Sequence, residues 1–142
     1  MSTCSCGLAL IASTWVSPGD PVVLEEPGYF GALDAFRSTG ARLIGAPVER
    51  DGVRRAVLRQ RIQESRARLA FIVPSFQNPT GAVMSRQDLE DVAAFACERD
   101  LIVITDEIYG ELTYDAPHTS IVSLPGMCGR TIFLHGFSKA WA

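Results

Sequence analysis

The sequence lacks an excess of charge of either sign. It contains 13 Lys and Arg against 16 Asp and Glu, which gives a net charge of −3. Its basic residues are scattered, apart from a local excess of arginine across residues 54–68. A nucleic-acid-binding protein usually presents a clustered basic patch. We therefore expect no nucleic acid partner, and we interpret the local excess as the solvated face of a helix.

Long hydrophobic runs are also missing. The apolar stretch at residues 8–12 is far shorter than the roughly 20 residues that cross a bilayer as a helix. No basic residue precedes it, and the turn Ser17-Pro18-Gly19-Asp20 closes it. The sequence therefore predicts neither a signal peptide nor a membrane segment.

Cysteine pairs with the spacing of a metal site are absent as well. The four cysteines are Cys4, Cys6, Cys97 and Cys128, and none of them forms a CxxC pair. A zinc site would need further ligands at recognisable spacing. We predict no metal site, and free thiols in a reducing compartment, which favours a cytoplasmic protein.

The sequence does contain apolar, β-branched stretches that alternate with helical patterns. Hydrophobic residues make up 47% of its 142 residues, enough for one domain with a sizeable core. The alternation predicts an α/β fold with three layers, α/β/α, in which helices cover both faces of a mostly parallel sheet. The expected strands are residues 21–25, 42–47, 70–73, 101–105 and 131–134, and the expected helices are residues 7–16, 29–39 and 53–67 and one that begins near Ser85.

The helix near Ser85 has the clearest pattern. Ser85 and Asp88 have the spacing of a capping box, with Asp in place of the usual Glu or Gln. One apolar face follows at helical spacing, made by Leu89, Val92, Ala93 and Ala96.

Polar side chains follow three successive strands of the predicted sheet. Asn78, Asp106 and Lys139 each come shortly after a strand, and about one βαβ unit of roughly 30 residues separates each from the next. Ligands of open α/β sheets bind beyond the carboxyl ends of the strands. We therefore expect an amide, a carboxylate and an amine to converge at one edge of the sheet, with Tyr109 within reach.

Taken singly, these residues have ordinary structural explanations. Asn78 suits a turn, Asp106 and Glu107 suit a helix cap, and Lys139 suits a surface position. Tyr109, like Tyr29, suits half-buried packing. Only their joint order and spacing favours a site.

Three other polar residues receive no role from the sequence. We assign no catalytic function to Glu107. His118 and His135 have no partner at ligand spacing, so we expect them to be structural or exposed.

Four stretches carry a resemblance to a known family. They are Pro27-Gly28-Tyr29, Asn78-Pro79-Thr80-Gly81, Asp106-Glu107-Ile108-Tyr109 and Phe137-Ser138-Lys139-Ala140. In order and spacing they resemble the pyridoxal-phosphate-dependent class I/II aminotransferases of fold type I. The resemblance runs from about Thr3 to the last residue. Within the family, the sequence looks most like the subgroup that includes bacterial aspartate and aromatic aminotransferases.

The resemblance implies a role for each matching side chain toward pyridoxal 5′-phosphate. Lys139 would bind the cofactor covalently through its amine and, once displaced by the substrate amine, act as the base. Asp106 would keep the pyridine nitrogen protonated, so that the ring accepts electrons. Asn78 and Tyr109 would donate to the phenolate oxygen, and Tyr29 would stack on the ring. Lys139, Asp106 and Tyr109 would thus be the catalytic residues.

The resemblance also implies how the backbone shapes the site. The loop Thr3-Cys4-Ser5, before the first helix, would bind the phosphate group through backbone N–H groups, with Ser138 as a further contact. Cis peptide bonds are implied at Glu26–Pro27 and Asn78–Pro79.

The same resemblance implies that residues 1–142 are part of a longer protein. The family has an arginine soon after the lysine and a second arginine in a small C-terminal domain, and the sequence contains neither. We expect an incomplete large domain without the small domain and the N-terminal segment, inactive by itself. The full-length protein would be a homodimeric transaminase acting on an amino acid and a 2-oxo acid.

Two alternatives share the same motifs. One is another fold-type-I enzyme that uses the same cofactor, such as a carbon–sulfur lyase. The other is a non-catalytic, aminotransferase-like sensing domain of a transcription regulator.

Overall fold

A single mixed sheet organises the part of the chain that the structure describes. The structure is a computed structural model that describes residues 3–114 and 117–141, without the side chains of residues 3, 4 and 140. Its elements are α1 (Thr3–Trp15), β1 (Pro21–Glu26), α2 (Phe30–Ser38), β2 (Arg42–Glu49), β3 (Gly52–Val53), α3 (Arg55–Ser65), β4 (Leu69–Ile72), α4 (Arg86–Arg99), β5 (Ile102–Asp106), η1 (Ile121–Ser123), β6 (Thr131–Leu134) and α5 (Phe137–Ala140).

The order of the strands creates a switch point in the middle of the sheet. The order is β3-β2-β1-β4-β5-β6. All neighbouring strands are parallel except the short β3, which pairs antiparallel with β2. The chain first passes from β1 outward to β2, then returns to the other side of β1 as β4. The carboxyl ends of β1 and β4 therefore flank the kind of crevice where α/β proteins bind ligands.

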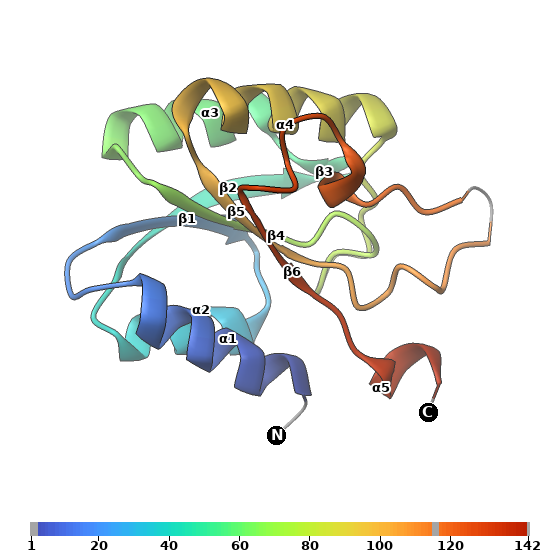
Figure 1. Ribbon diagram of the computed structural model, residues 1–142, viewed down its shortest axis with the longest axis horizontal. Helices are drawn as coiled ribbons and strands as arrows, with labels where there is room; N and C mark the ends of the chain where they lie inside the picture. Colours follow the sequence, from blue (N-terminus) through green and yellow to red (C-terminus); the bar gives the residue numbers. More distant parts are fainter. Residues whose placement is uncertain (1–2, 115–116, 142) are drawn as a thin grey trace.

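Helices cover both faces of the sheet, as the alternating pattern predicts. Figure 1 shows α3 and α4 on one face and α1 and α2 on the other. Adjacent residues of each central strand enter different cores, because side chains alternate along a strand. In β1, Val23 packs under α3 and α4, whereas Val22 and Leu24 pack against α1 and α2. The strands are therefore apolar on both faces, as in a buried parallel sheet.

The cap of α4 confirms the sequence pattern. Ser85 Oγ accepts a hydrogen bond from the Asp88 N–H at 3.2 Å, and the Ser85 N–H donates to Asp88 Oδ2 at 3.1 Å. Leu89, Val92, Ala93 and Ala96 are all buried. The helix ends at Asp100, which adopts a left-handed backbone conformation with φ of 51°.

The first helix begins earlier than predicted. Thr3-Cys4-Ser5 is not a loop but the first turn of α1. The sequence pattern predicts a helix start at Gly7, but Gly7 lies inside α1 for a packing reason. A Cβ atom at position 7 would lie 3.2 Å from Leu134 Cδ2, so glycine permits close approach of α1 to β6.

The third helix is shorter than predicted at both ends. Residues 53–67 were expected to be helical, but Val53 belongs to β3 and α3 spans Arg55–Ser65. Gly52 has φ of 103°, a conformation that favours glycine and that lets the chain turn from β2 into β3. Arg66, with φ of 57°, ends the helix in the left-handed region.

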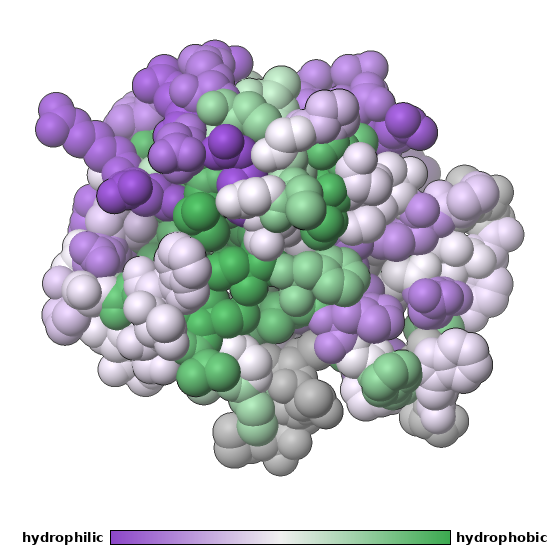
Figure 2. All heavy atoms as spheres, viewed as in Figure 1, coloured by the Kyte–Doolittle hydropathy of each residue, from purple (hydrophilic) through white to green (hydrophobic). Residues whose placement is uncertain are grey.

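The face shown in Figure 2 is apolar across its middle, between the polar surface over α3 and α4 and the lower helical layer. In the described part of the sheet β6 is an edge strand, and its Phe133 is 47% exposed. Among the described residues no helix has the length and apolar character needed to cross a bilayer.

Candidate active site at the strand ends

A cavity of about 210 Å³ lies at the carboxyl ends of the central strands. The structure brings together at this cavity the residues that the strand-end positions singled out. Its lining consists of Tyr29, Val73, Asn78, Asp106, Ile108, Tyr109 and Lys139. The convergence follows from topology, because parallel strands all end at the same edge of the sheet.

Each polar lining residue is positioned by a different element. Tyr29 precedes the first turn of α2, which follows β1. Asn78 lies in the loop after β4, Asp106 is the last residue of β5, and Lys139 lies in α5, just beyond β6. The peptide bonds Glu26–Pro27 and Asn78–Pro79 are both cis, which confirms that prediction.

Asp106 contributes a buried carboxyl group to the cavity. The residue is 4% exposed, and burial raises the pKa of its carboxyl above the ordinary value. A hydrogen bond from the Ile108 N–H to Oδ1, at 3.1 Å, and the nearby His135 lower the pKa, while Glu107 raises it. A cation held against this carboxylate would favour its charged form. The site is therefore suited to a ligand that places a cationic group against Asp106.

Tyr29 connects the cavity to the start of α1. Its hydroxyl lies 3.2 Å from Ser5 Oγ, within hydrogen-bonding distance. The first turn of α1 therefore approaches the site, as a phosphate-binding helix N-terminus would. The side chains of Thr3 and Cys4 lie outside the described residues.

Ser138 is placed differently from the other predicted ligands. It is exposed, and it does not line the strand-end cavity. Its neighbour Lys139 is also exposed but does line the cavity. The amine can therefore act at the cavity while remaining accessible to solvent.

A second buried carboxyl, Glu25, lies next to the site and was missed in the sequence. Glu25 is 2% exposed; its Oε1 accepts from the Val73 N–H at 3.1 Å, and its Oε2 has no hydrogen-bond partner among the described residues. Burial raises the pKa of Glu25 to about 8, while Val73 and Gln77 lower it and Asp106 raises it. Gln77 Nε2 donates to the Pro27 carbonyl at 2.8 Å. The signal that could have identified Glu25 is an acidic residue at the end of an apolar strand.

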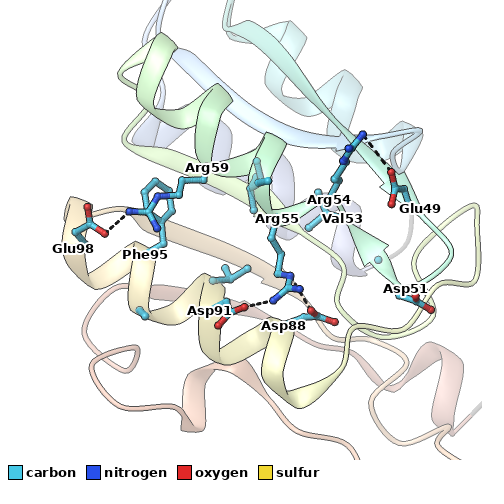
Figure 3. A pocket seen from close by; sticks show the side chains of 15 residues that line it. Glu49, Asp51, Val53, Arg54, Arg55, Arg59, Asp88, Asp91, Phe95 and Glu98 are labelled. Carbon is cyan, nitrogen blue, oxygen red and sulfur yellow. Dashed lines mark hydrogen bonds and ion pairs between the residues drawn. The ribbon is translucent and has the colours of Figure 1, made fainter.

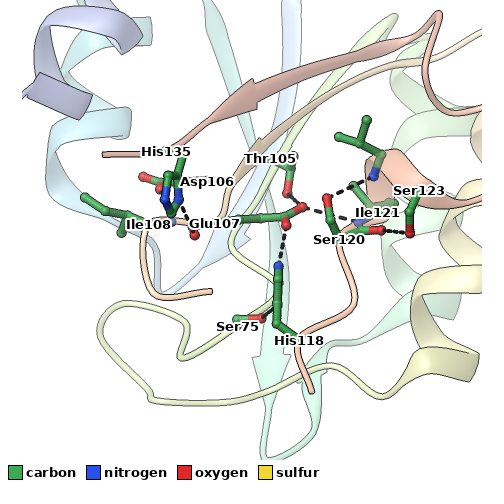
Figure 4. Close-up of polar contacts among 11 residues, drawn as sticks. Ser75, Thr105, Asp106, Glu107, Ile108, His118, Ser120, Ile121, Ser123 and His135 are labelled. Carbon is green, nitrogen blue, oxygen red and sulfur yellow. Dashed lines mark hydrogen bonds and ion pairs between the residues drawn. The ribbon is translucent and has the colours of Figure 1, made fainter. Parts of the chain in front are cut away.

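Glu107, to which the sequence pattern assigns no role, is at the centre of a polar network beside the site (Figure 4). Its Oε2 accepts from His118 Nε2 at 2.6 Å, and its Oε1 accepts from Thr105 Oγ1 at 3.0 Å. Its carbonyl oxygen lies 3.1 Å from His135 Nδ1, which must donate because a carbonyl can only accept. Both histidines, which the sequence left without a partner, contact Glu107.

A larger hollow, of about 700 Å³, lies between α3 and α4 (Figure 3). Ion pairs line it: Arg55 pairs with Asp88 at 2.8 Å and also with Asp91, and Arg59 pairs with Glu98 at 2.9 Å. These arginines are half-exposed members of the predicted basic face. Because the charges of the hollow are neutralised by each other, we place the functional site at the smaller strand-end cavity.

The described residues offer no group of three or more His, Cys, Asp or Glu arranged to bind a metal ion. Cys6, Cys97 and Cys128 are free thiols, and the side chain of Cys4 lies outside the described residues. The polar chemistry of the site thus rests on an amine, a carboxylate, an amide and phenols.

Comparisons with known proteins found similar sequences and structures. A family model described as Aminotransferase class I and II matches residues 1–142. The chain is 41% identical over 132 residues to the protein YugH of Bacillus subtilis, covering 89% of this chain and 33% of that protein. It is 38% identical over 132 residues to an aspartate aminotransferase of Pyrococcus abyssi, covering 92% of this chain and 34% of that enzyme.

A solved structure shares the fold closely. LysN, the α-aminoadipate aminotransferase of Thermus thermophilus, was solved in complex with N-(5′-phosphopyridoxyl)-L-leucine. It matches with a TM-score of 0.90 and 33% identity, covering 95% of this chain and 36% of that chain. The chain spans about a third of the length of the curated relatives it matches.

Proposed function

The chain belongs to the class I and II aminotransferases, and on this premise we propose that the protein carrying it is a transaminase dependent on pyridoxal 5′-phosphate. It would transfer an amino group from an amino acid to a 2-oxo acid. The observation that carries the proposal is the convergence of Lys139, Asp106, Asn78 and Tyr109 on one cavity. These groups suit the cofactor: an amine for its aldehyde, a carboxylate for its ring nitrogen, and two donors for its phenolate oxygen.

Lys139 and Asp106 perform the chemistry in this proposal. Lys139 is the only lysine in residues 1–142 and the only lysine that lines the cavity. Once released by the substrate's amino group, the Lys139 amine removes the proton from the substrate α-carbon. Asp106 holds a proton on the ring nitrogen through a charge-assisted hydrogen bond. When bound, the cofactor supplies the electron sink for the carbanion.

The remaining lining residues orient the ring. Asn78 and Tyr109 donate to the phenolate oxygen, which stabilises its charged form. Tyr29 stacks on the ring, with its hydroxyl directed to Ser5. Backbone N–H groups in the first turn of α1, at residues 3–5, bind the phosphate group, with Ser138 as a further contact from α5.

We further infer that residues 1–142 form part of the large domain of a longer, cytoplasmic homodimer. The share of the relatives' length that the chain covers, about a third, supports the first point. The free thiols at Cys6, Cys97 and Cys128 support a reducing compartment. Two of the proteins named above carry different amino acids in their names, aspartate and α-aminoadipate, so the proposed substrate is a class and not one compound.

Covalent trapping tests the proposal directly. The protein that carries this chain is mixed with pyridoxal 5′-phosphate, reduced with borohydride and digested. Mass spectrometry should place the phosphopyridoxyl group on Lys139, because no other lysine occurs in residues 1–142. Lys139→Ala should lose both the visible absorption band of the bound cofactor and nearly all turnover. Turnover equal to wild type in Lys139→Ala would refute the assignment.

Asp106→Ala separates binding from chemistry. The variant should keep the visible band, because Lys139 is intact. Its rate should fall more than its cofactor affinity, since the lost charge acts mainly in the transition state. Ser123→Ala, remote from the cavity lining, is the control and should behave as wild type.

A further inference from the structure

Glu107 is connected to all three strand ends that carry the proposed cofactor ligands: it lies at one, bonds directly to the second, and reaches the third through His118. The residue is 1% exposed and lies directly after β5, next to Asp106. Its main-chain N–H donates to the Leu134 carbonyl at 3.0 Å, and its own carbonyl accepts from His135 Nδ1 at 3.1 Å. Leu134 and His135 begin the segment that leads to Lys139. The backbone of Glu107 thus ties the Asp106 segment to the Lys139 segment.

The carboxylate of Glu107 reaches the third strand end. Its Oε2 accepts from His118 Nε2 at 2.6 Å, and the other ring nitrogen, Nδ1, lies 3.0 Å from Ser75 Oγ. Ser75 lies in the loop after β4, shortly before Asn78. The connection runs from the Asp106 segment through an imidazole to the Asn78 segment (Figure 4).

The hydrogen bonds of this connection are mutually consistent. A neutral His118 with its proton on Nε2 donates to the carboxylate and accepts from the Ser75 hydroxyl. The second carboxylate oxygen, Oε1, accepts from Thr105 Oγ1 at 3.0 Å and from the Ile121 N–H at 3.3 Å. Both carboxylate oxygens are therefore satisfied although the group is buried, and a fully satisfied buried network is rigid.

We propose that Glu107, acting through His118 and Ser75, is a positioning residue that holds Asn78, Asp106 and Lys139 at their working separation around the cofactor. This inference rests on the proposed function of the same cavity. Glu107 itself does not line the cavity, so it acts through the backbone and through its neighbours. A displacement of about 1 Å in such a site can cost on the order of 100-fold in rate.

The test compares variants of the cofactor-loaded protein that carries this chain. Glu107→Ala should lower kcat by roughly 10- to 100-fold while the visible absorption band persists. The visible circular dichroism of the bound cofactor, per mole bound, should also change, because it reports how the ring is held. Ser120→Ala is the matched control: Ser120 lies in the same loop as His118, and its Oγ accepts only from the Val122 N–H, at 3.3 Å. It should keep kcat within about twofold of wild type, whatever its melting temperature.

Glu107→Gln provides the rescue. Its amide oxygen can replace Oε1, and its NH₂ can donate to His118 Nε2 if the imidazole moves its proton to Nδ1 and donates to Ser75. The network then survives without charge, so kcat and circular dichroism should return most of the way to wild type. Impairment equal to that of Glu107→Ala would show that charge matters and would overturn the positioning role.

Ser75→Ala keeps the inference testable if Glu107→Ala does not fold. It removes only the link to the Asn78 loop, and it should lower kcat several-fold with a change in visible circular dichroism. Wild-type values of both in Ser75→Ala and Glu107→Ala would overturn the proposal. Failure of the proposed function has a different signature, since wild-type protein would then show no visible band that depends on Lys139.

Discussion

Two carboxyls, Glu25 and Asp106, are buried at the carboxyl ends of β1 and β5, and burial raises the pKa of both. The charge of Asp106 raises the pKa of Glu25 further, because two like charges in a buried site disfavour double ionisation. Glu25, with a pKa of about 8, holds its proton at neutral pH. Asp106 can therefore be the ionised member of the pair, which is the state that a protonated ring nitrogen requires.

Glu25 should make stability depend on pH. Between about pH 5 and pH 8 the folded protein keeps a proton on Glu25 that the unfolded chain has released, so stability should fall as pH rises. One such group contributes at most about 1.4 kcal/mol per pH unit. Glu25→Gln keeps the shape of the protonated acid but cannot titrate.

Urea denaturation of both proteins at a series of pH values measures this effect. The two curves of unfolding free energy against pH should coincide near pH 5 and diverge toward pH 8, with Glu25→Gln the more stable at high pH. Asp106 titrates in both proteins, so its contribution cancels. Parallel curves across the range would show that Glu25 is ionised in the folded protein.

Single residues were predictable where topology decides their place. Asn78, Asp106 and Lys139 were found because each follows a strand, and strand ends meet at one edge of a parallel sheet. Glu107 and His118 could not be paired from the sequence, because their contact depends on how the loop after β5 folds back over the sheet. No periodic pattern records that path.

At the scale of elements, α4 depends on its cap. Ser85→Ala removes the acceptor for the Asp88 N–H and should lower the unfolding free energy by about 1 kcal/mol. Ser13→Ala is the control, because Ser13 is an exposed residue inside α1 whose hydroxyl bonds only to the Leu10 carbonyl. That change should be neutral, since alanine is the better helix former. Chemical denaturation measures both, and an equal loss would contradict the capping role.

Helices and strands were predicted best where an apolar pattern coincided with a stop signal. The strand at residues 131–134 was predicted with the bounds that the structure gives β6. The helix predicted to stop at Gly40 corresponds to α2, which ends just before that glycine. The start of α1 and the strand β3 were missed for physical reasons. Gly7 is present for contact with Leu134, and β3 forms only because β2 is beside it. Both depend on tertiary contacts.

At the scale of the whole molecule, β6 is an edge strand of the described sheet with exposed apolar side chains on and beyond it. Phe133 on this strand is 47% exposed, and Phe137 and Trp141 just beyond it are 76% and 71% exposed. An edge strand with apolar side chains pairs readily with other chains. Residues 1–142 expressed alone should therefore self-associate as concentration rises.

Sedimentation velocity over a range of concentrations measures this association. Phe133→Lys places a charge on the edge strand and should shift the equilibrium toward monomer. Arg61→Ala, in the helical layer on α3, is a control that should leave association unchanged. A wild-type chain that stays monomeric at all concentrations would contradict the prediction.

The path of the chain through the sheet sets the order in which the cavity can be assembled. β1 and β4 are neighbours in the sheet yet lie far apart in the sequence, and Lys139 is placed only when β6 has paired with β5. Contacts of such large sequence separation form late in folding, because loop closure must be achieved first. A folding chain would therefore retain pyridoxal 5′-phosphate only after both pairings have formed. Binding of the cofactor through Lys139 would then report that β6 has paired with β5.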